Sequence, residues 1–381
     1  MRIGIDITFL VANYPGTGIY FYIRRMLESL YRTANEESIS LFFADYPKLI
    51  NPVKYAEVKS FFKSWPLKGW KLPRWAYKIR LQLSAYSRME VFHYPSDCIF
   101  YENVPHRANV FTLPDLTFIH YPEHHRSETV NVWGKFCERA VEHGDVILTY
   151  SEHTRQDIVR TLGVPGTKIR VTPLAAGSEF QPIPDKTLLR SKLSLFDLQD
   201  QKYILSVGTL EPRKNQACLI RAFARLVQRD KNLSHKLVFV GGRGWKYESI
   251  FETVEKMGLE DRVVFLGYSD PLEVLYNGAD LMVYPSLYEG FGLPPLEAMS
   301  CGTPVITSNR SSLPEVVGDA ALIVEPEDEI TLSETMYQVL QDKTIRERLA
   351  EKGVQRAREF SWERTARTTL AAYNEAYRMK A

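Results

Sequence analysis

The chain has 381 residues, of which 45% are hydrophobic and 25% charged, and its formal net charge is +2. This length exceeds what one hydrophobic core usually serves, so two domains are expected. The composition is that of an ordinary globular protein, and the nearly balanced charge argues against a general nucleic-acid binder.

The cysteines and the apolar runs exclude further classes. The four cysteines are scattered, and no close pair indicates a zinc knuckle or a disulfide framework, so a reducing, cytoplasmic compartment is expected. Segment 1–10 has the pattern of a buried strand and lacks the long apolar core of a signal peptide. No apolar run approaches the roughly 18 residues that span a bilayer. We therefore do not expect an integral membrane protein.

The first half of the chain alternates apolar strands with helices. A glycine loop follows the first strand, and Ser151 is placed to cap a helix because its hydroxyl can accept a backbone N–H of the first turn. The proline-flanked segment 179–185 is the predicted linker to the second half. Strands are predicted at 3–10, 145–150 and 168–174, with helices over 19–30 and directly after Ser151.

The second half repeats the alternation more clearly. Three of its strands end in glycine, at Gly208, Gly241 and Gly267, where a tight turn or the close approach of a ligand would be needed. Ligands of open α/β sheets gather at the carboxyl ends of the strands. Strands are predicted at 203–208, 236–241, 262–267, 281–285 and 304–308, and the clearest helix covers 215–228.

This pattern predicts the architecture. Apolar strands without alternation, separated by helices, are typical of a parallel sheet covered on both faces. We therefore predict an α/β protein of two doubly wound domains that face each other across a cleft, one over 1–178 and one over 186–358. Periodicity does not decide whether the last helix, within 359–381, stays on the second domain or crosses back to the first.

Segment 285–306 combines glycine, proline and carboxylates. Pro294 and Pro295 suit the first turn of a helix, so the backbone N–H groups of Phe291, Gly292 and Leu293 would point out of its start, where phosphate binds well. Glu289 lies before that start, and Glu297 lies in the first turns. Two carboxylates at this spacing could accept hydroxyls from two parts of one ligand. Alternatively, Glu297 only complements the helix dipole while Glu289 is solvated.

Arg213 and Lys214 form a second candidate site for phosphate. They stand directly before the helix that starts at Asn215, and two cations there suit a diphosphate that must be stabilised as it leaves. The alternative is a pair of solvated charges in a loop. Because the sequence contains no Asp-x-Asp triplet, no carboxylate pair is evident for a metal-bridged diphosphate. We therefore expect neither a metal nor another cofactor.

These residues carry a family resemblance over nearly the whole chain, strongest over 203–326. The stretch EGFGLPPLEAMSCGTPVI resembles the E-x7-E signature of retaining GT-B glycosyltransferases of glycosyltransferase family 4. SVGTLEPRKN, FVGGRGW, VVFLGY and SSLPEVVGDAALIVEP resemble other blocks of that family in the same order. The resemblance implies the GT-B fold, in which two Rossmann-like domains face each other across a cleft, with the acceptor on the N-terminal and the nucleotide sugar on the C-terminal domain.

The resemblance also implies roles for single residues. Arg213 and Lys214 would bind the donor diphosphate, Glu289 would contact the donor sugar, and Glu297 would take the ribose hydroxyls. The remaining donor-binding residues would be the backbone of Gly290, Phe291, Gly292 and Leu293, the strand-end glycines Gly208 and Gly241, and Gly267 and Tyr268 near the base.

The first domain matches the family less well. Gly18 stands where the family has its glycine loop, but Tyr20 replaces a second glycine that is common there, and the loop fails as a dinucleotide fingerprint. Pro114 stands where relatives commonly have a histidine beside the reacting sugar, whereas Asp115 is retained. Asp115 is therefore predicted only as a cleft residue facing the acceptor, and the absent histidine puts a side-chain role there in doubt.

Two further groups in the first domain attract attention. His120, His124 and His125 could suggest a metal site, but a wet loop is expected because no tetrahedral set of ligands is evident. Segment 61–83 carries six cations and no acid, interleaved with tryptophans, which suits either an anionic membrane surface or a surface loop with buried rings. Its predicted membrane-surface or acceptor-side residues are Trp65, Trp70, Trp75, Lys68, Lys71 and Arg74.

The sequence thus predicts a retaining glycosyltransferase that moves a hexose from a nucleotide diphosphate sugar to a glycan or lipid-linked glycan. Bacterial mannosyltransferases of cell-surface polysaccharide assembly are the relatives indicated, so the donor expected is GDP-mannose. We expect the enzyme in the cytoplasm, with peripheral contact to the inner face of the membrane, and expect Glu289→Ala to abolish transfer with little loss of fold. A catalytically inactive nucleotide-sugar-binding scaffold, a sugar-nucleotide epimerase and a phosphorylase remain alternatives.

Overall fold

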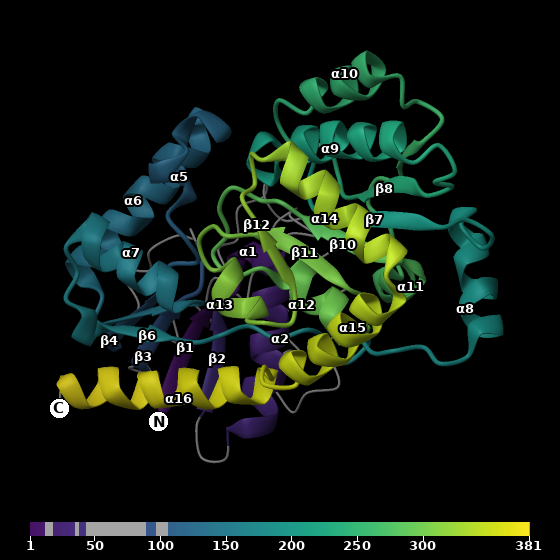
Figure 1. The fold of residues 1–381 in the computed structure, drawn as a ribbon. Helices are drawn as coiled ribbons and strands as arrows, with labels where there is room; N and C mark the ends of the chain where they lie inside the picture. The colour runs from purple at the N-terminus through teal and green to yellow at the C-terminus, as the bar shows by residue number, and fades with distance from the viewer. Residues whose placement is uncertain (12–17, 35–37, 43–88, 97–105, 381) are drawn as a thin grey trace.

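The computed structural model describes residues 1–11, 18–34, 38–42, 89–96 and 106–380. They contain two six-stranded parallel sheets, with strand orders β2-β1-β3-β4-β5-β6 and β12-β11-β10-β7-β8-β9 (Figure 1). The first sheet is formed by β1 (Arg2–Asp6), β2 (Ser38–Phe42), β3 (Met89–Tyr94), β4 (His106–Thr112), β5 (Val146–Thr149) and β6 (Ile169–Val171). The second is formed by β7 (Tyr203–Val207), β8 (Lys236–Val240), β9 (Val263–Phe265), β10 (Leu281–Tyr284), β11 (Val305–Ser308) and β12 (Leu322–Val324).

Helices alternate with these strands, as the sequence pattern predicts. Those of the first half are α1 (Thr8–Val11), α2 (Gly18–Thr33), α5 (Thr117–His120), α6 (Ser127–His143) and α7 (Glu152–Leu162), with the 3-10 turns η1 (Pro122–His124) and η2 (Gly166–Lys168). Those of the second are α8 (Lys186–Leu193), α9 (Gln216–Arg229), α10 (Glu248–Met257), α11 (Leu272–Gly278), α12 (Leu293–Ser300), α13 (Leu313–Val317), α14 (Glu329–Gln341) and α15 (Lys343–Ala357), with the turns η3 (Ser194–Phe196) and η4 (Pro212–Lys214).

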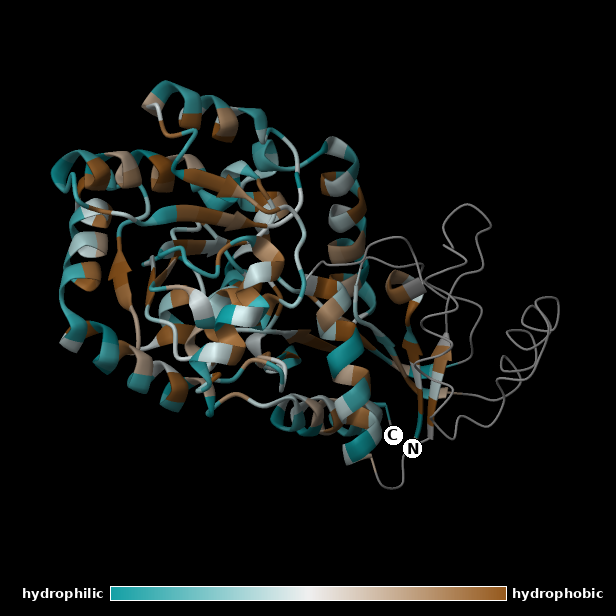
Figure 2. Ribbon diagram, turned by 90° about the vertical axis from the view of Figure 1, so that its right-hand side faces the viewer, coloured by the Kyte–Doolittle hydropathy of each residue, from teal (hydrophilic) through white to brown (hydrophobic). Residues whose placement is uncertain are grey.

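Apolar burial explains why both sheets are covered on two faces. Every residue of β7 is buried, which is the continuous apolar run expected of a central parallel strand. On one face of the second sheet, Phe223 of α9 and Met336 of α14 belong to one apolar cluster. Residues of the other face, such as Leu205, belong to a cluster that continues into the first half. Figure 2 shows largely apolar strands surrounded by helices in which apolar and polar residues alternate.

The last helix, α16 (Trp362–Met379), lies against the first half of the chain. It packs on α2 and on β3, β4 and β5, and in Figure 1 it runs beside the first sheet. Its Tyr373 is fully buried, and the hydroxyl lies 2.7 Å from Nδ1 of His93 in β3. Periodicity left the position of this helix open, and the structure shows that it crosses back.

Segment 61–83 lies outside the described residues. The prediction for Trp65, Trp70, Trp75, Lys68, Lys71 and Arg74 therefore stays a prediction from composition. No helix in the described part of the chain combines the length and the apolar character that crossing a bilayer requires.

Candidate active site

The carboxyl ends of β7 and β10 bring two predicted segments together. The turn η4 follows β7 and carries Arg213 and Lys214, while the loop that carries Glu289 follows β10. The amide of Leu287 donates to the Arg213 carbonyl at 2.9 Å, and an Arg213 Nη donates back to the Tyr288 carbonyl at 2.6 Å. Two segments more than 70 residues apart thus form one rigid unit at the edge of the second sheet where ligands of such sheets bind.

Glu289 is the centre of this unit. Its side chain is buried, and four donors meet its Oε1: Lys214 Nζ at 2.6 Å, Ser286 Oγ at 2.6 Å, the Tyr284 hydroxyl at 2.9 Å and an Arg213 Nη at 3.1 Å. Burial alone would raise the pKa of this carboxyl, but the charges of Lys214 and Arg213 overcome it and lower the pKa to about 2. Glu289 is therefore ionised and not solvated, which excludes the solvated alternative.

Glu211 completes a cluster of two cations and two carboxylates. It is 3% exposed and accepts from Arg213 Nη2 at 2.5 Å. Burial opposes the charge of Arg213, yet Glu289 and Glu211 raise the pKa of its guanidinium. Burial and the neighbouring Arg213 lower the pKa of Lys214. A bound diphosphate would add negative charge beside both cations and so favour the charged form of Lys214.

The start of α12 stands next to this cluster. Gly292 precedes the helix with φ at 116°, and Pro294 and Pro295 occupy its first turn, where their missing N–H groups leave no bond unmade. Ser312 holds the loop before this helix, because its hydroxyl lies 2.9 Å from the Glu289 carbonyl oxygen and 2.7 Å from that of Phe291. The amide of Glu289 donates to Ser311 Oγ at 2.8 Å. The helix start predicted from the two prolines is confirmed.

Glu297 lies on α12 with a different environment. Its Oε2 accepts from the Tyr276 hydroxyl at 3.0 Å. Burial is the main cause that raises the pKa of this carboxyl to about 7, with Glu179 adding to the rise, although Tyr276 and Arg25 act against it. The surroundings of the two glutamates therefore shift their pKa values in opposite directions, down for Glu289 and up for Glu297.

Three glycines follow strands of the second sheet, one residue after β7 and β8 and two residues after β9, where the sequence predicted them at the strand ends. Gly208, Gly241 and Gly267 all have positive φ, of 146°, 150° and 67°. A side chain at Gly241 would place its Cβ 2.1 Å from the Gly208 carbonyl oxygen, so only glycine fits there. Gly241 donates to the Gly267 carbonyl at 2.8 Å, and the next residue, Tyr268, is 67% exposed. The positive φ at all three positions, with the close backbone contact at Gly241, accounts for the glycines without requiring a ligand.

The first half contributes the loop after β4. Asp115 accepts from the amide and the hydroxyl of Thr117, at 2.9 and 2.5 Å. This loop touches the second half, because a Cβ at Gly290 would lie 2.2 Å from the Pro114 carbonyl oxygen. Asp115 thus stands beside the loop of Glu289. Gly18, by contrast, is exposed as the first residue of α2, and a Cβ added there would meet no atom of the described residues within 4 Å.

The histidines of the first half lie closer to the second half than a wet loop implies. The rings of His125 and Trp245 stack with centroids 5.4 Å apart, and Lys246 donates to the Glu123 carbonyl at 2.9 Å. Burial lowers the pKa of both His124 and His125. In the described ranges no three His, Cys, Asp or Glu side chains are grouped as a metal would need.

Sequence reasoning missed the residues that orient the charged groups. Tyr284 and Ser286, which contact Glu289, come from the carboxyl end of β10, and Glu211 stands two residues before Arg213. Polar residues at a predicted strand end were a usable signal for the first two. No sequence signal indicated that Asp157 of α7 accepts a hydrogen bond from Tyr288 in the other half of the chain.

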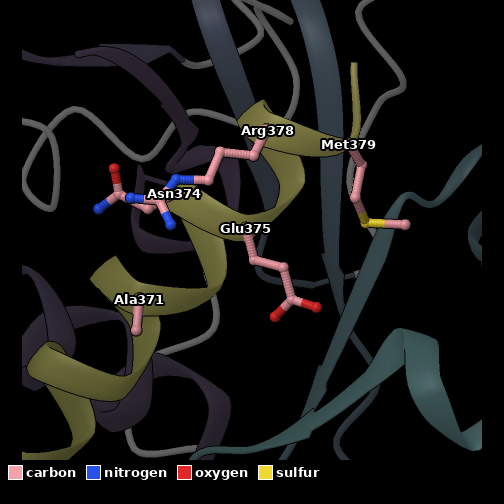
Figure 3. A pocket seen from close by; sticks show the side chains of 5 residues that line it. All are labelled: Ala371, Asn374, Glu375, Arg378 and Met379. Atoms are coloured by element: carbon pink, nitrogen blue, oxygen red, sulfur yellow. The ribbon is translucent and has the colours of Figure 1, made fainter. Parts of the chain in front are cut away.

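A separate hollow of about 620 Å³ opens on α16 (Figure 3). It is lined by Ala371, Asn374, Glu375, Arg378 and Met379, none of which is a predicted site residue. Glu375 is ion-paired with Arg170 of β6. The hollow therefore lies apart from the charged cluster.

Comparison with known sequences indicates a family. The model of the family described as glycosyl transferases group 1 matches residues 192–356. The O-antigen chain mannosyltransferase B of Escherichia coli is 34% identical over 379 residues, which cover 95% of this chain and 97% of that protein. The match therefore includes both sheets and the predicted site.

Comparison with solved structures shows the same fold. A sucrose-phosphate synthase of Thermosynechococcus elongatus superposes with a TM-score of 0.74 and 23% identity, covering 100% of both chains. Anabaena Alr3699/HepE in complex with UDP and glucose superposes with a TM-score of 0.75 and 17% identity, covering 98% of this chain and 100% of that one. At these identities the likeness concerns the two-sheet fold alone.

Proposed function

The chain belongs to the group 1 glycosyl transferases, has the GT-B fold and is a glycosyltransferase; from that premise we propose that it transfers mannose from GDP-mannose, with retention, to a glycan or lipid-linked glycan of a cell-surface polysaccharide. The sugar and the pathway rest on the 34% identity to an O-antigen chain mannosyltransferase. The site rests on one observation, the buried cluster in which Arg213 and Lys214 meet Glu289.

In this proposal the two cations stabilise the departing diphosphate. In the described part of the chain, Nε of Arg213 is buried and has no hydrogen-bond partner. Among the described residues the Lys214 ammonium donates to the Tyr284 hydroxyl and to Glu289, and its third N–H group would donate to a phosphate oxygen. The start of α12 adds backbone donors and the positive end of a helix dipole. Side chains and backbone would thus neutralise the leaving group without a metal.

Glu289 would hold the donor sugar while it orients the cations. Its four side-chain contacts with described residues go to Oε1, so Oε2 would be the oxygen that accepts a hydrogen bond from a sugar hydroxyl. Glu297 would receive the ribose hydroxyls in the same way. The acceptor would then attack on the face that the diphosphate leaves, inside a cleft closed against water. Asp115 faces this cleft from the first half.

The donor is tested by unfolding the protein with GDP, UDP, ADP and TDP and their common hexose conjugates. A ligand at 100 times its dissociation constant adds about 2.7 kcal/mol to the stability of the folded state. We expect stabilisation by GDP and GDP-mannose and release of GDP when octyl α-mannoside is added as a probe acceptor. Binding without release would support the scaffold alternative, conversion of the donor without an acceptor the epimerase, and turnover that depends on inorganic phosphate the phosphorylase.

We also propose a cytoplasmic enzyme that touches the inner face of the membrane through segment 61–83. The support is composition, since six cations and three tryptophans alternate there without an acid. The protein should sediment with phosphatidylglycerol vesicles at low salt and be released at high salt. Absence of sedimentation at low salt would oppose the proposal.

A further inference from the structure

The loop that carries Glu289 is also held by the other half of the chain. Ser151, the first residue before α7, donates from Oγ to the Gly290 carbonyl at 2.9 Å. Thr154 lies 3.4 Å from the same oxygen. Both residues are fully buried, so this contact between the halves is closed to water.

A second contact holds the residue on the other side of Glu289. The Tyr288 hydroxyl donates to Asp157, which is 6% exposed and lies one turn beyond Thr154 on the same face of α7. His120 also contacts this carboxylate, at 2.9 Å. Rings of the first half surround the Tyr288 ring, with the centroid of Tyr121 at 6.0 Å.

A third contact joins the start of α7 to α13 of the second half. Glu315 of α13 accepts from the amides of Glu152 and His153 at 2.9 and 3.1 Å, so the start of α7 receives a carboxylate from the second half. The positive end of α7 favours this arrangement. Figure 1 shows α7 and α13 on the sides of the two halves that face each other.

We propose that Asp157 is a positioning residue for glycosyl transfer, which sets the Glu289 loop through Tyr288 only when the two halves meet. Among the residues that the structure describes, the side-chain contacts of Glu289 come from its own half and would persist if the halves separated. The contacts to Tyr288 and Gly290 come from α7 and would be lost if the two halves separated. Closure would therefore complete the loop at the moment when water is excluded. The inference rests on the proposed role of Glu289.

A double-mutant cycle tests this coupling. Tyr288→Phe and Asp157→Ala should each lower kcat about tenfold or more, with the donor KM within about twofold, because a displaced reacting group costs rate rather than binding. The double variant should be no slower than the slower single variant. Asp157→Asn keeps an acceptor for the hydroxyl and should restore part of kcat. Additive losses, or a loss in KM alone, would overturn the proposal.

Two controls separate positioning from folding and from the proposed function. Tyr203→Phe removes another buried tyrosine bond, 2.7 Å long to the Leu275 carbonyl, away from the loop, and should leave kcat unchanged. Amide hydrogen exchange over 285–292, measured without acceptor substrate, should rise in Asp157→Ala and not in Tyr203→Phe. Equal exchange rates in the two variants would refute the coupling. If Glu289→Gln keeps its turnover, the proposed function fails. If that variant is inactive while Tyr288→Phe has the wild-type rate, only the positioning inference fails.

Discussion

Glu289→Gln should destabilise the fold as well as stop transfer. The variant keeps the shape of the side chain but removes the charge that Arg213 and Lys214 face inside the protein. The pKa of Glu289 is lowered from 4.5 to about 2, and at about 1.4 kcal/mol per pKa unit this corresponds to about 3 kcal/mol of stability at pH 7. Removing one partner of a buried pair typically costs about 3–5 kcal/mol, which agrees. This replaces the expectation from sequence that the fold would hardly suffer.

The pH dependence of this stability difference shows whether it comes from the charge of Glu289 or from the packing of its side chain. The pKa of Glu289 in the folded state lies below its ordinary value. Its ionised carboxylate therefore contributes fully to the free energy of unfolding above about pH 4.5, and this contribution is lost as the pH falls towards 2. In urea unfolding from pH 7 to pH 3.5, the difference in the free energy of unfolding between wild type and Glu289→Gln should narrow below pH 4.5. Glu325→Gln is a matched control, because its pair with Arg310 is exposed and should be worth less than about 1 kcal/mol. A gap below about 1 kcal/mol at pH 7, or one independent of pH, would refute the reasoning.

Three other substitutions probe separate parts of the site. The pKa of Glu297 is raised from 4.5 to about 7, so wild type should lose stability between pH 5 and pH 8 relative to Glu297→Gln in urea unfolding; parallel profiles would contradict this. Arg213→Ala should weaken binding of nucleoside diphosphates by about tenfold or more, and that of monophosphates far less, by titration calorimetry; equal losses would remove Arg213 from the diphosphate site. Gly241→Ala should cost at least about 2 kcal/mol in the same unfolding assay, whereas Gly242→Ala, with open space around its Cβ, should cost little, and similar values would oppose the steric argument.

The parts of the molecule that depend on local pattern could be predicted from the sequence. Apolar runs predicted β7 to β11 of the second sheet but not the short β12, and Pro294 with Pro295 predicted the start of α12. Arg213 and Lys214 lie beside Glu289 because both segments follow parallel strands, whose carboxyl ends meet at one edge.

The rest depends on contacts between distant parts of the chain. Glu289 is paired with Lys214 and bonded to the Tyr284 hydroxyl, and spacing alone does not show whether a carboxylate is paired or solvated. Contacts such as that between Tyr288 and Asp157 depend on how the two halves meet, which no periodicity encodes. The roles of the donor-binding residues and the membrane segment stay predictions.

Because α16 packs on the first half of the chain, that half cannot complete its packing until the C-terminal residues have been translated. This helix fills the surface beside α2 and the first sheet, and Arg107 of β4 donates to the carbonyl of Lys380. A nascent chain on the ribosome therefore exposes the apolar patch around His93 until residues 362–379 have been translated, long after the first sheet is complete. The first half should consequently engage chaperones during translation, while the second sheet, whose strands end at Val324, can form earlier than the half that precedes it.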